Sequence, residues 1–283
     1  MEVAVVSLAD ERALRAALKD VDTIFHLASA ESQGRDANLL AVDIRGTDNL
    51  ARMAVDAGVQ RMVYVSHIGA SRSSAYPAFK SKAIAEEYIR RSGVPHTIFR
   101  SSLVFGPEDH FTTALARLLR AAPGFFPLPG GGRSVLQPLW VEDLVSVMLW
   151  SLDNPETVNQ TYEVGGSEYF TLRQIVENIM DLQHVRRKLF ALSPVTMRAL
   201  TVTLESFVPN FPVSSFWLDY VAVNRTCPVD NLPRQFGLMP ARFTYRLAYL
   251  KRVPWYESIW QRMVNVYSSV TEKILESVRT FHF

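Results

Sequence analysis

Hydrophobic and polar positions alternate in two ways along the first half of the chain. Short apolar runs typical of strands cover residues 3–6, 23–27, 61–66 and 97–105. Between them, residues 10–18, 48–57 and 79–91 repeat their apolar positions at helical spacing. Strands separated by helices are typical of βαβ units, whose right-handed crossovers build a parallel sheet. The pattern therefore predicts an α/β fold with a doubly wound parallel sheet and ligands at the carboxyl ends of its strands.

The pattern loosens after Gly106 and predicts a smaller second part. We expect a helix at 112–120, a loop rich in proline and glycine at 123–132, a short strand into 138–141 and a helix at 142–151. Thr171 and Gln174 have the spacing of a capping box before a further helix. The predicted division is a doubly wound sheet domain over 1–163, a small C-terminal lobe over 164–253, and an amphipathic helix over 254–283. That helix packs on the body of the protein, or it docks on a partner or a membrane surface.

Composition narrows the classes of partner and compartment. Hydrophobic residues make up 48% of the chain and charged residues 20%, which is typical of a folded globular protein. Thirty basic residues against 28 acidic ones leave a net charge of +2, too small to indicate a nucleic acid as partner. Cys227 is the single cysteine, and the six histidines lack metal-ligand spacing, so we expect no metal site and a reducing, cytoplasmic compartment. No apolar run is long enough to cross a membrane.

Five segments carry a resemblance to a known family. They are VDTIFHLA at 21–28, GTDNL at 46–50, AGVQRMVYVS at 57–66, RSSLVFGP at 100–107 and VEDL at 141–144. In order and spacing, the chain resembles the extended and atypical short-chain dehydrogenase/reductases, which have a Rossmann-like fold. Within that superfamily it is most similar to the NmrA-like branch and to the nucleotide-binding accessory subunit of respiratory complex I.

The resemblance implies NAD or NADP as cofactor and a protein partner or a second copy of the chain. It favours a binding, accessory or regulatory role, because many of these relatives have little or no demonstrated catalytic use for the nucleotide. The alternative is an NAD(P)-dependent oxidoreductase or epimerase/dehydratase acting on a small carbonyl or sugar-type substrate. By the same resemblance, the cofactor would contact Leu27, Ala28, Ser66, Lys82, Ser101 and Val104.

The chain also departs from the family pattern. No glycine-rich turn follows a first strand, although such a turn lets the backbone approach the pyrophosphate. Residues 3–6 align with the family's third strand, so we expect a truncated chain in which the strand at 23–27 has an open apolar edge. The alternative is a naturally shortened protein whose edge a partner covers. Val6-Ser7-Leu8 replaces the usual Gly-Asp-Leu beside the adenine, and Asp43 stands where the family often has Asn.

Catalysis in this superfamily needs a tyrosine hydroxyl and a lysine four residues later on a helix. Tyr76 and Lys80 have this spacing, with Ser66 to orient a substrate. A second register aligns Lys82 with the family's lysine and leaves Ala78 at the tyrosine position. The two registers differ by about 200° around a helix and cannot face the same site. Both stay open at this point. Asp143, with Trp140 and Gln137, resembles the segment that closes over the substrate, or it serves the start of a helix.

Overall fold

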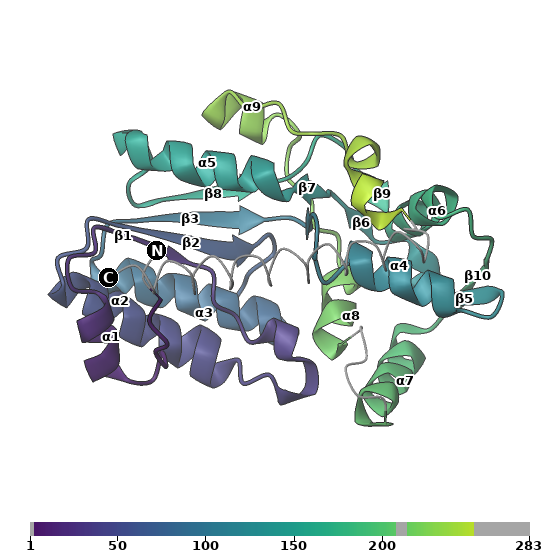
Figure 1. The fold of residues 1–283 in the computed structure, drawn as a ribbon, viewed down its shortest axis with the longest axis horizontal. Helices are drawn as coiled ribbons and strands as arrows, with labels where there is room; N and C mark the ends of the chain where they lie inside the picture. The colour runs from purple at the N-terminus through teal and green to yellow at the C-terminus, as the bar shows by residue number, and fades with distance from the viewer. Residues whose placement is uncertain (1–2, 208–213, 252–283) are drawn as a thin grey trace, which may run out of the picture.

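The computed structural model describes residues 3–207 and 214–251, which form a sheet domain and a smaller lobe at its end (Figure 1). Four parallel strands form the central sheet in the order β1-β2-β3-β8. Their bounds are Thr23–His26 (β1), Arg61–His67 (β2), His96–Ser101 (β3) and Gln160–Val164 (β8). The inner strand β2 is almost wholly buried and is apolar over residues 62–65, because helices cover both faces of a parallel sheet.

Helices lie on both faces of this sheet. On one face are α1 (Glu11–Ala17), α2 (Thr47–Asp56) and α3 (Pro77–Ser92), and on the other are α5 (Val141–Asp153) and α9 (Asn231–Phe236) (Figure 1). Asp10 caps α1 by accepting from the backbone of Ala13, and Gly93 ends α3 with a positive φ of 84°. The predicted doubly wound parallel sheet is confirmed.

Two short helical segments connect β1 to α2 at the carboxyl end of the sheet. They are the 3₁₀ segment Glu31–Asp36 (η1) and the π-helical segment Leu40–Gly46 (η2), which runs directly into α2. Their polar side chains Glu31 and Asp43 point back toward β2 and α3, where both make hydrogen bonds or ion pairs. This connection brings two carboxylates to the edge where ligands bind in open α/β sheets.

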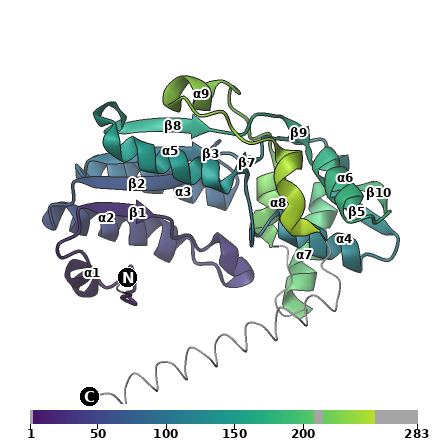
Figure 2. The same ribbon diagram turned by 45° about the horizontal axis from the view of Figure 1, so that its top comes forward.

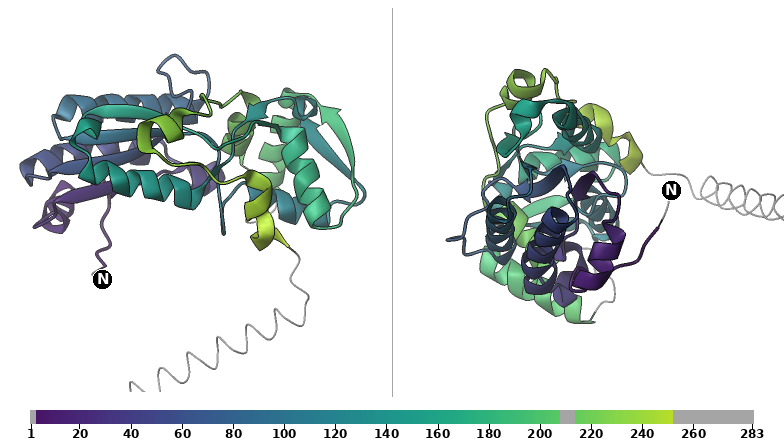
Figure 3. Two further views of the ribbon diagram at one scale, coloured as in Figure 1. Left: turned by 90° about the horizontal axis from the view of Figure 1, so that it is seen from above. Right: turned by 90° about the vertical axis from the view of Figure 1, so that its left-hand side faces the viewer.

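The lobe is built from short strands and four helices at the carboxyl end of the sheet (Figures 2 and 3). Its strands pair as β4 (Val104–Phe105) with β7 (Leu139–Trp140), β5 (Phe125–Pro129) with β10 (Lys188–Leu192), and β6 (Val135–Leu136) with β9 (Phe170–Thr171). Its helices are α4 (Thr112–Ala121), α6 (Leu172–Leu182), α7 (Pro194–Phe207) and α8 (Ser215–Ala222), with the 3₁₀ segments η3 (Gly130–Gly132) and η5 (Phe243–Leu250). A further 3₁₀ segment, η4 (Pro155–Thr157), joins α5 to β8 in the sheet domain. The predicted capping box of Thr171 and Gln174 opens α6.

Three predicted elements differ from the structure. Residues 3–6 form no strand; Val3 and Val5 are 74% and 99% exposed. A strand needs a neighbour for its backbone groups, and no described strand lies beside this segment. The strand expected at 97–105 stops at Ser101, and the chain resumes as β4 in the lobe. The loop expected at 123–132 contains β5, because its prolines leave enough backbone groups free for pairing with β10.

The lobe is discontinuous in sequence, which differs from the expected boundary between residues 163 and 164. That boundary falls inside β8, and α4 and β5 share one hydrophobic cluster with α6 and η5 through Leu115, Phe126, Ile175 and Leu247. The predicted helix at 254–283 lies outside the described residues. Within the described ranges, no helix combines the length and the apolar character needed to span a bilayer.

Candidate active-site edge of the sheet

The two candidate tyrosine and lysine registers lie on different sides of α3. Ala78 and Lys82 are buried against the sheet, whereas Lys80 is exposed. Tyr76 occupies the N-cap position, half-buried, with its ring 6.1 Å from that of Phe79. The register that faces the sheet therefore presents a methyl group where a catalytic hydroxyl would stand. Whether either pair takes part in catalysis stays a prediction.

Lys82 belongs to a buried polar cluster below the carboxyl end of β1 and β2. Its Nζ lies 3.3 Å from Asp43 Oδ1, and the two side chains are only 4% and 0% exposed. The same carboxylate accepts from the Ser29 hydroxyl at 2.7 Å and from the Ala30 amide at 3.0 Å. Burial alone would lower the pKa of Lys82, but Tyr64, Glu31 and Asp43 together raise it. Lys82 and Asp43 thus form a charged pair at neutral pH.

Two aromatic residues of this cluster stay neutral. The His26 ring stacks on Tyr64 with centroids 5.2 Å apart, and its Nε2 is 2.7 Å from the Thr47 hydroxyl. Burial, helped by the charge of Lys82, lowers the pKa of His26 to about 3. Burial also raises the pKa of Tyr64 to about 12, and its hydroxyl has no hydrogen-bond partner.

A trio of Glu31, His67 and Tyr220 joins the sheet to the lobe. His67 Nε2 lies 3.1 and 3.2 Å from the two carboxylate oxygens of Glu31. The Tyr220 hydroxyl of α8 donates to Glu31 and contacts His67 Nε2. The side chains of Glu31 and His67 are each 12% exposed, so the trio is reached by solvent.

Electrostatics within the trio favours an ionised Glu31 beside two neutral rings. Burial alone would raise the pKa of Glu31, but His67, Lys82 and Tyr220 hold it well below its usual range. Burial lowers the pKa of His67 although Glu31 opposes this shift. Burial and the neighbouring Glu31 raise the pKa of Tyr220 well above its ordinary value. The phenol is therefore a hydrogen-bond donor at the sheet edge.

Sequence reasoning missed this trio. His67 is the residue after Ser66 at the end of a predicted strand, and that position alone could have identified it. Glu31 and Tyr220 are 189 residues apart in the chain, and no spacing rule links them. Their meeting depends on how α8 packs against η1 and α3.

The other predicted site residues occupy varied environments. Leu27 and Ala28 are exposed just beyond β1, and Val104 is half-buried in β4. The Ser66 hydroxyl donates to Glu86 at 2.6 Å, on the α3 side of the sheet. The Ser101 hydroxyl donates to the Ser66 carbonyl at 3.2 Å and is buried. Leu27, Ala28, Ser66 and Ser101 thus all lie at the carboxyl end of the sheet, but both serines already have protein partners.

The segment expected to close over a substrate is tied into the lobe instead. The Asp143 carboxylate accepts from the Ala241 amide at 2.8 Å, and burial raises its pKa. Trp140 Nε1 donates to Glu142 at 2.9 Å. The Gln137 side chain donates to the Gly166 carbonyl at 2.7 Å and accepts from the Cys227 amide at 2.8 Å. These contacts hold β7, α5 and the segment after β8 together.

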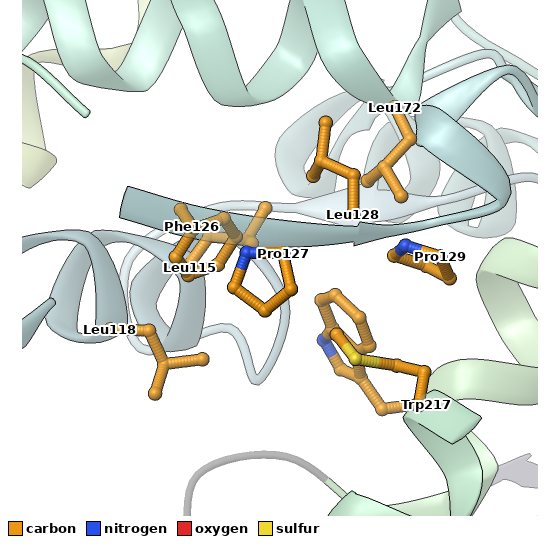
Figure 4. A pocket seen from close by; sticks show the side chains of 9 residues that line it. Leu115, Leu118, Phe126, Pro127, Leu128, Pro129, Leu172 and Trp217 are labelled. Carbon is orange, nitrogen blue, oxygen red and sulfur yellow. The ribbon is translucent and has the colours of Figure 1, made fainter. Parts of the chain in front are cut away.

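The lobe has a small apolar pocket that is separate from this edge. It has a volume of about 30 Å³, and Figure 4 shows Trp217 opposite Pro127 and Pro129 of β5, with Leu118 on the far side. That volume holds about one water molecule. It is too small and too apolar for a nucleotide. Within the described ranges, no group of three or more His, Cys, Asp or Glu side chains is placed to hold a metal ion.

The residues of the sheet edge fit part of a dinucleotide. Leu27 and Ala28 are exposed just beyond β1, and the next residues, Ser29 and Ala30, bind the Asp43 carboxylate that pairs with Lys82. Gly165 and Gly166 follow β8, but a Cβ on either would come within 2.4 or 1.8 Å of Gln137 or Pro138, so their space is already filled. No described segment forms the glycine-rich turn that would hold a pyrophosphate.

The fold and this edge define a nucleotide-binding protein of the Rossmann-like class. Residues 1–114 match a family described as NAD(P)H-binding. The chain is 29% identical over 175 residues to mitochondrial NADH dehydrogenase [ubiquinone] 1 alpha subcomplex subunit 9 of Arabidopsis thaliana, which covers 61% of this chain and 43% of that protein. The subunit 9 of Rattus norvegicus is 28% identical over 177 residues, covering 62% and 46%. The chain thus spans less than half the length of these relatives.

Solved structures share the fold. Triphenylmethane reductase of Citrobacter sp., complexed with NADP(H), superimposes with a TM-score of 0.67 at 16% identity, covering 88% of this chain and 82% of that one. The dTDP-glucose 4,6-dehydratase of Streptomyces venezuelae with NAD bound gives a TM-score of 0.64 at 21% identity, covering 86% and 76%. The expected resemblance to an NAD(P)H-binding family and to the complex I subunit is thus found in the sequence, and the expected Rossmann-like fold is shared with the solved structures of a reductase and a dehydratase.

Proposed function

We propose that this chain is an NAD(P)-binding accessory domain that works within a protein assembly and does not itself transfer hydride. One observation carries the proposal. The buried face of α3 presents Ala78 where a proton-donating hydroxyl is needed, and Lys82 beside it is paired with Asp43. Carbonyl reduction needs a group that moves a proton within hydrogen-bond reach of the substrate. A nicotinamide bound at this face would lack that group.

Two further features support an accessory role. The outer edge of β1 has no partner among the described strands, and its Phe25 is 39% exposed, with Leu27 exposed just beyond. An exposed apolar strand edge favours contact with another chain. The relatives of highest identity given above are named as subunits of NADH dehydrogenase.

An NAD(P)-dependent oxidoreductase or epimerase/dehydratase is a second candidate, favoured by one observation. The Tyr220 hydroxyl lies at the carboxyl end of the sheet, hydrogen-bonded to Glu31 and in contact with His67. A phenol held by a carboxylate and an imidazole can donate a proton to a substrate. If the chain is an enzyme, Tyr220 of the lobe would supply the proton-donating hydroxyl that is missing at Ala78.

Titration of the purified chain with NADH and NADPH, followed by nicotinamide fluorescence, separates the two candidates. We expect saturable binding and unchanged nicotinamide absorbance when small aldehydes, ketones or nucleotide sugars are added. Turnover that falls at least about 100-fold in Tyr220→Phe or Tyr76→Phe would establish the enzyme instead. Lys188→Met, which changes an exposed side chain of β10 outside both candidate registers, is the control. Failure of both nucleotides to bind would refute the proposal at its first step.

A further inference from the structure

Arg225 is a fully buried cation with unused hydrogen-bond donors. Its Nη2 donates to the Ser101 carbonyl at 3.2 Å, while Nε and Nη1 have no partner. The guanidinium lies 4.3 Å from the ring centre of Tyr220 and 5.3 Å from that of Phe79. Among the described residues, no carboxylate forms an ion pair with it; burial lowers its pKa, and the charge of Glu31 opposes this shift from beyond ion-pair distance. This differs from Lys82 nearby, whose charge Asp43 balances.

A buried charged group whose N–H donors have no acceptor destabilises a fold. Arginine keeps its proton in proteins, so it cannot escape this cost by becoming neutral. The two flanking rings supply cation–π attraction, but they satisfy none of the N–H groups. The unfavourable free energy of burial therefore comes from the N–H groups of Nε and Nη1, which have no acceptor.

The backbone fixes Arg225 in this position. Its amide donates to the Val135 carbonyl at 3.0 Å, and the Asn224 side chain accepts from the Val135 amide at 2.9 Å. Two residues later, the Cys227 amide is bound by Gln137. The backbone of Arg225 is thus held beside β6, while its guanidinium reaches the end of β3.

We propose that Arg225 anchors a binding site for an oxyanion, the phosphate or carboxylate group of a small ligand, at the carboxyl ends of β2 and β3. The free nitrogens supply charge-assisted hydrogen bonds, which are the strong kind. The charge of Glu31 acts on Arg225, but its oxygens are bound by His67 and Tyr220 and accept no hydrogen bond from the guanidinium. A ligand reaches the guanidinium by displacing the partly exposed ring of Tyr220. This proposal does not rest on the proposed NAD(P) binding.

The NMR signal of the Arg225 Nε–H group reports anion binding at this side chain directly. Inorganic phosphate or acetate is titrated into ¹⁵N-labelled full-length chain, and the Nε–H resonance is assigned by its absence from Arg225→Met. We expect this resonance to shift and saturate, and the melting temperature of the wild type to rise with anion concentration. In Arg225→Met, anion binding should weaken at least about 10-fold, because the charge-assisted hydrogen bonds of the guanidinium are lost.

Controls separate this site from a purely structural arginine and from nucleotide binding. Arg246→Met changes an exposed arginine near Trp140 and should keep the full anion response. Competition by NADH or NADPH would identify the anion as a nucleotide phosphate, whereas binding without competition would indicate a separate ligand. An Arg225→Met protein whose melting temperature rises as much with either anion as that of the wild type would overturn the proposal.

Discussion

On α3, two lysines only two residues apart have opposite environments. Lys80 lies in solvent, while Lys82 is buried 3.3 Å from Asp43. Asp43 also depends on Ser29 and Ala30 for hydrogen bonds, so this carboxylate is held in place by three groups. An ion pair between exposed side chains contributes little, but removing one partner of a buried pair leaves an uncompensated charge.

We therefore expect Lys82→Met to lower the free energy of unfolding by about 3–5 kcal/mol. Lys80→Met should change it by less than about 0.5 kcal/mol, because this side chain is exposed. Urea unfolding of both variants at neutral pH measures the difference. If Lys82→Met were as stable as the wild type, the pair with Asp43 would be unimportant for the fold and Lys82 would be available for other roles.

At the scale of elements, Glu86 connects α3 to two strands. Its carboxylate accepts from Ser66 of β2 at 2.6 Å and from Arg100 of β3 at 2.9 and 2.7 Å. Arg90, one turn later on α3, donates at 2.8 Å. Burial would raise the pKa of Glu86, but these donors lower it. The same contacts explain why the Ser66 hydroxyl points toward α3.

Replacing Glu86 should loosen α3 from the sheet. We expect Glu86→Ala to destabilise the protein by about 3–5 kcal/mol, since Arg100 loses its buried partner. Its neighbour Glu87 pairs with Arg72 and Arg91 near the surface, so Glu87→Ala should change stability by about 1 kcal/mol at most. Denaturant unfolding measures the free energy of unfolding of both variants. An equal decrease in the two would show that the Glu86 contacts do not hold α3 on the sheet.

For the molecule as a whole, buried neutral histidines make stability depend on pH. The unfolded chain binds a proton on His26 below about pH 6.5, whereas the folded chain does so only near pH 3. Stability from this residue is therefore present above pH 6.5 and is lost as the pH falls toward 3. Burial also lowers the pKa values of His67 and His96, which adds to the loss with the same sign.

His26 alone should lower the free energy of unfolding by about 2 kcal/mol between pH 7 and pH 5. His26→Phe keeps an aromatic ring on Tyr64 and removes the titrating group. Between pH 7 and pH 5, the free energy of unfolding of this variant should therefore fall by about 2 kcal/mol less than that of the wild type. Urea unfolding at the two pH values measures both proteins. Glu31 does not interfere in this window, because its pKa is held below its ordinary value near 4.5. If the free energy of unfolding fell equally in the two proteins, His26 would not be responsible for the pH dependence.

Much of the sheet domain follows from local pattern. Apolar runs and helical spacing located β1, β2 and the helices α1 to α3, because these elements bury one face against neighbours close in sequence. The segment at 3–6 has a strand-like pattern but forms no strand, since pairing depends on a neighbour that periodicity cannot supply. Likewise, Pro127 and Pro129 indicated a loop, yet β10, some 60 residues later, pairs with this segment as a parallel strand.

The sequence by itself determined the α/β class, the family resemblance and the presence of Lys82 four residues before Glu86, because these properties depend on local periodicity and spacing. Only the tertiary structure decided which register of α3 faces the sheet, because rotation about the helix axis is fixed by packing. It alone brought Tyr220 to Glu31 and His67, and Arg225 to the end of β3. Those contacts join residues more than a hundred positions apart, and their geometry comes from the docking of the lobe on the sheet.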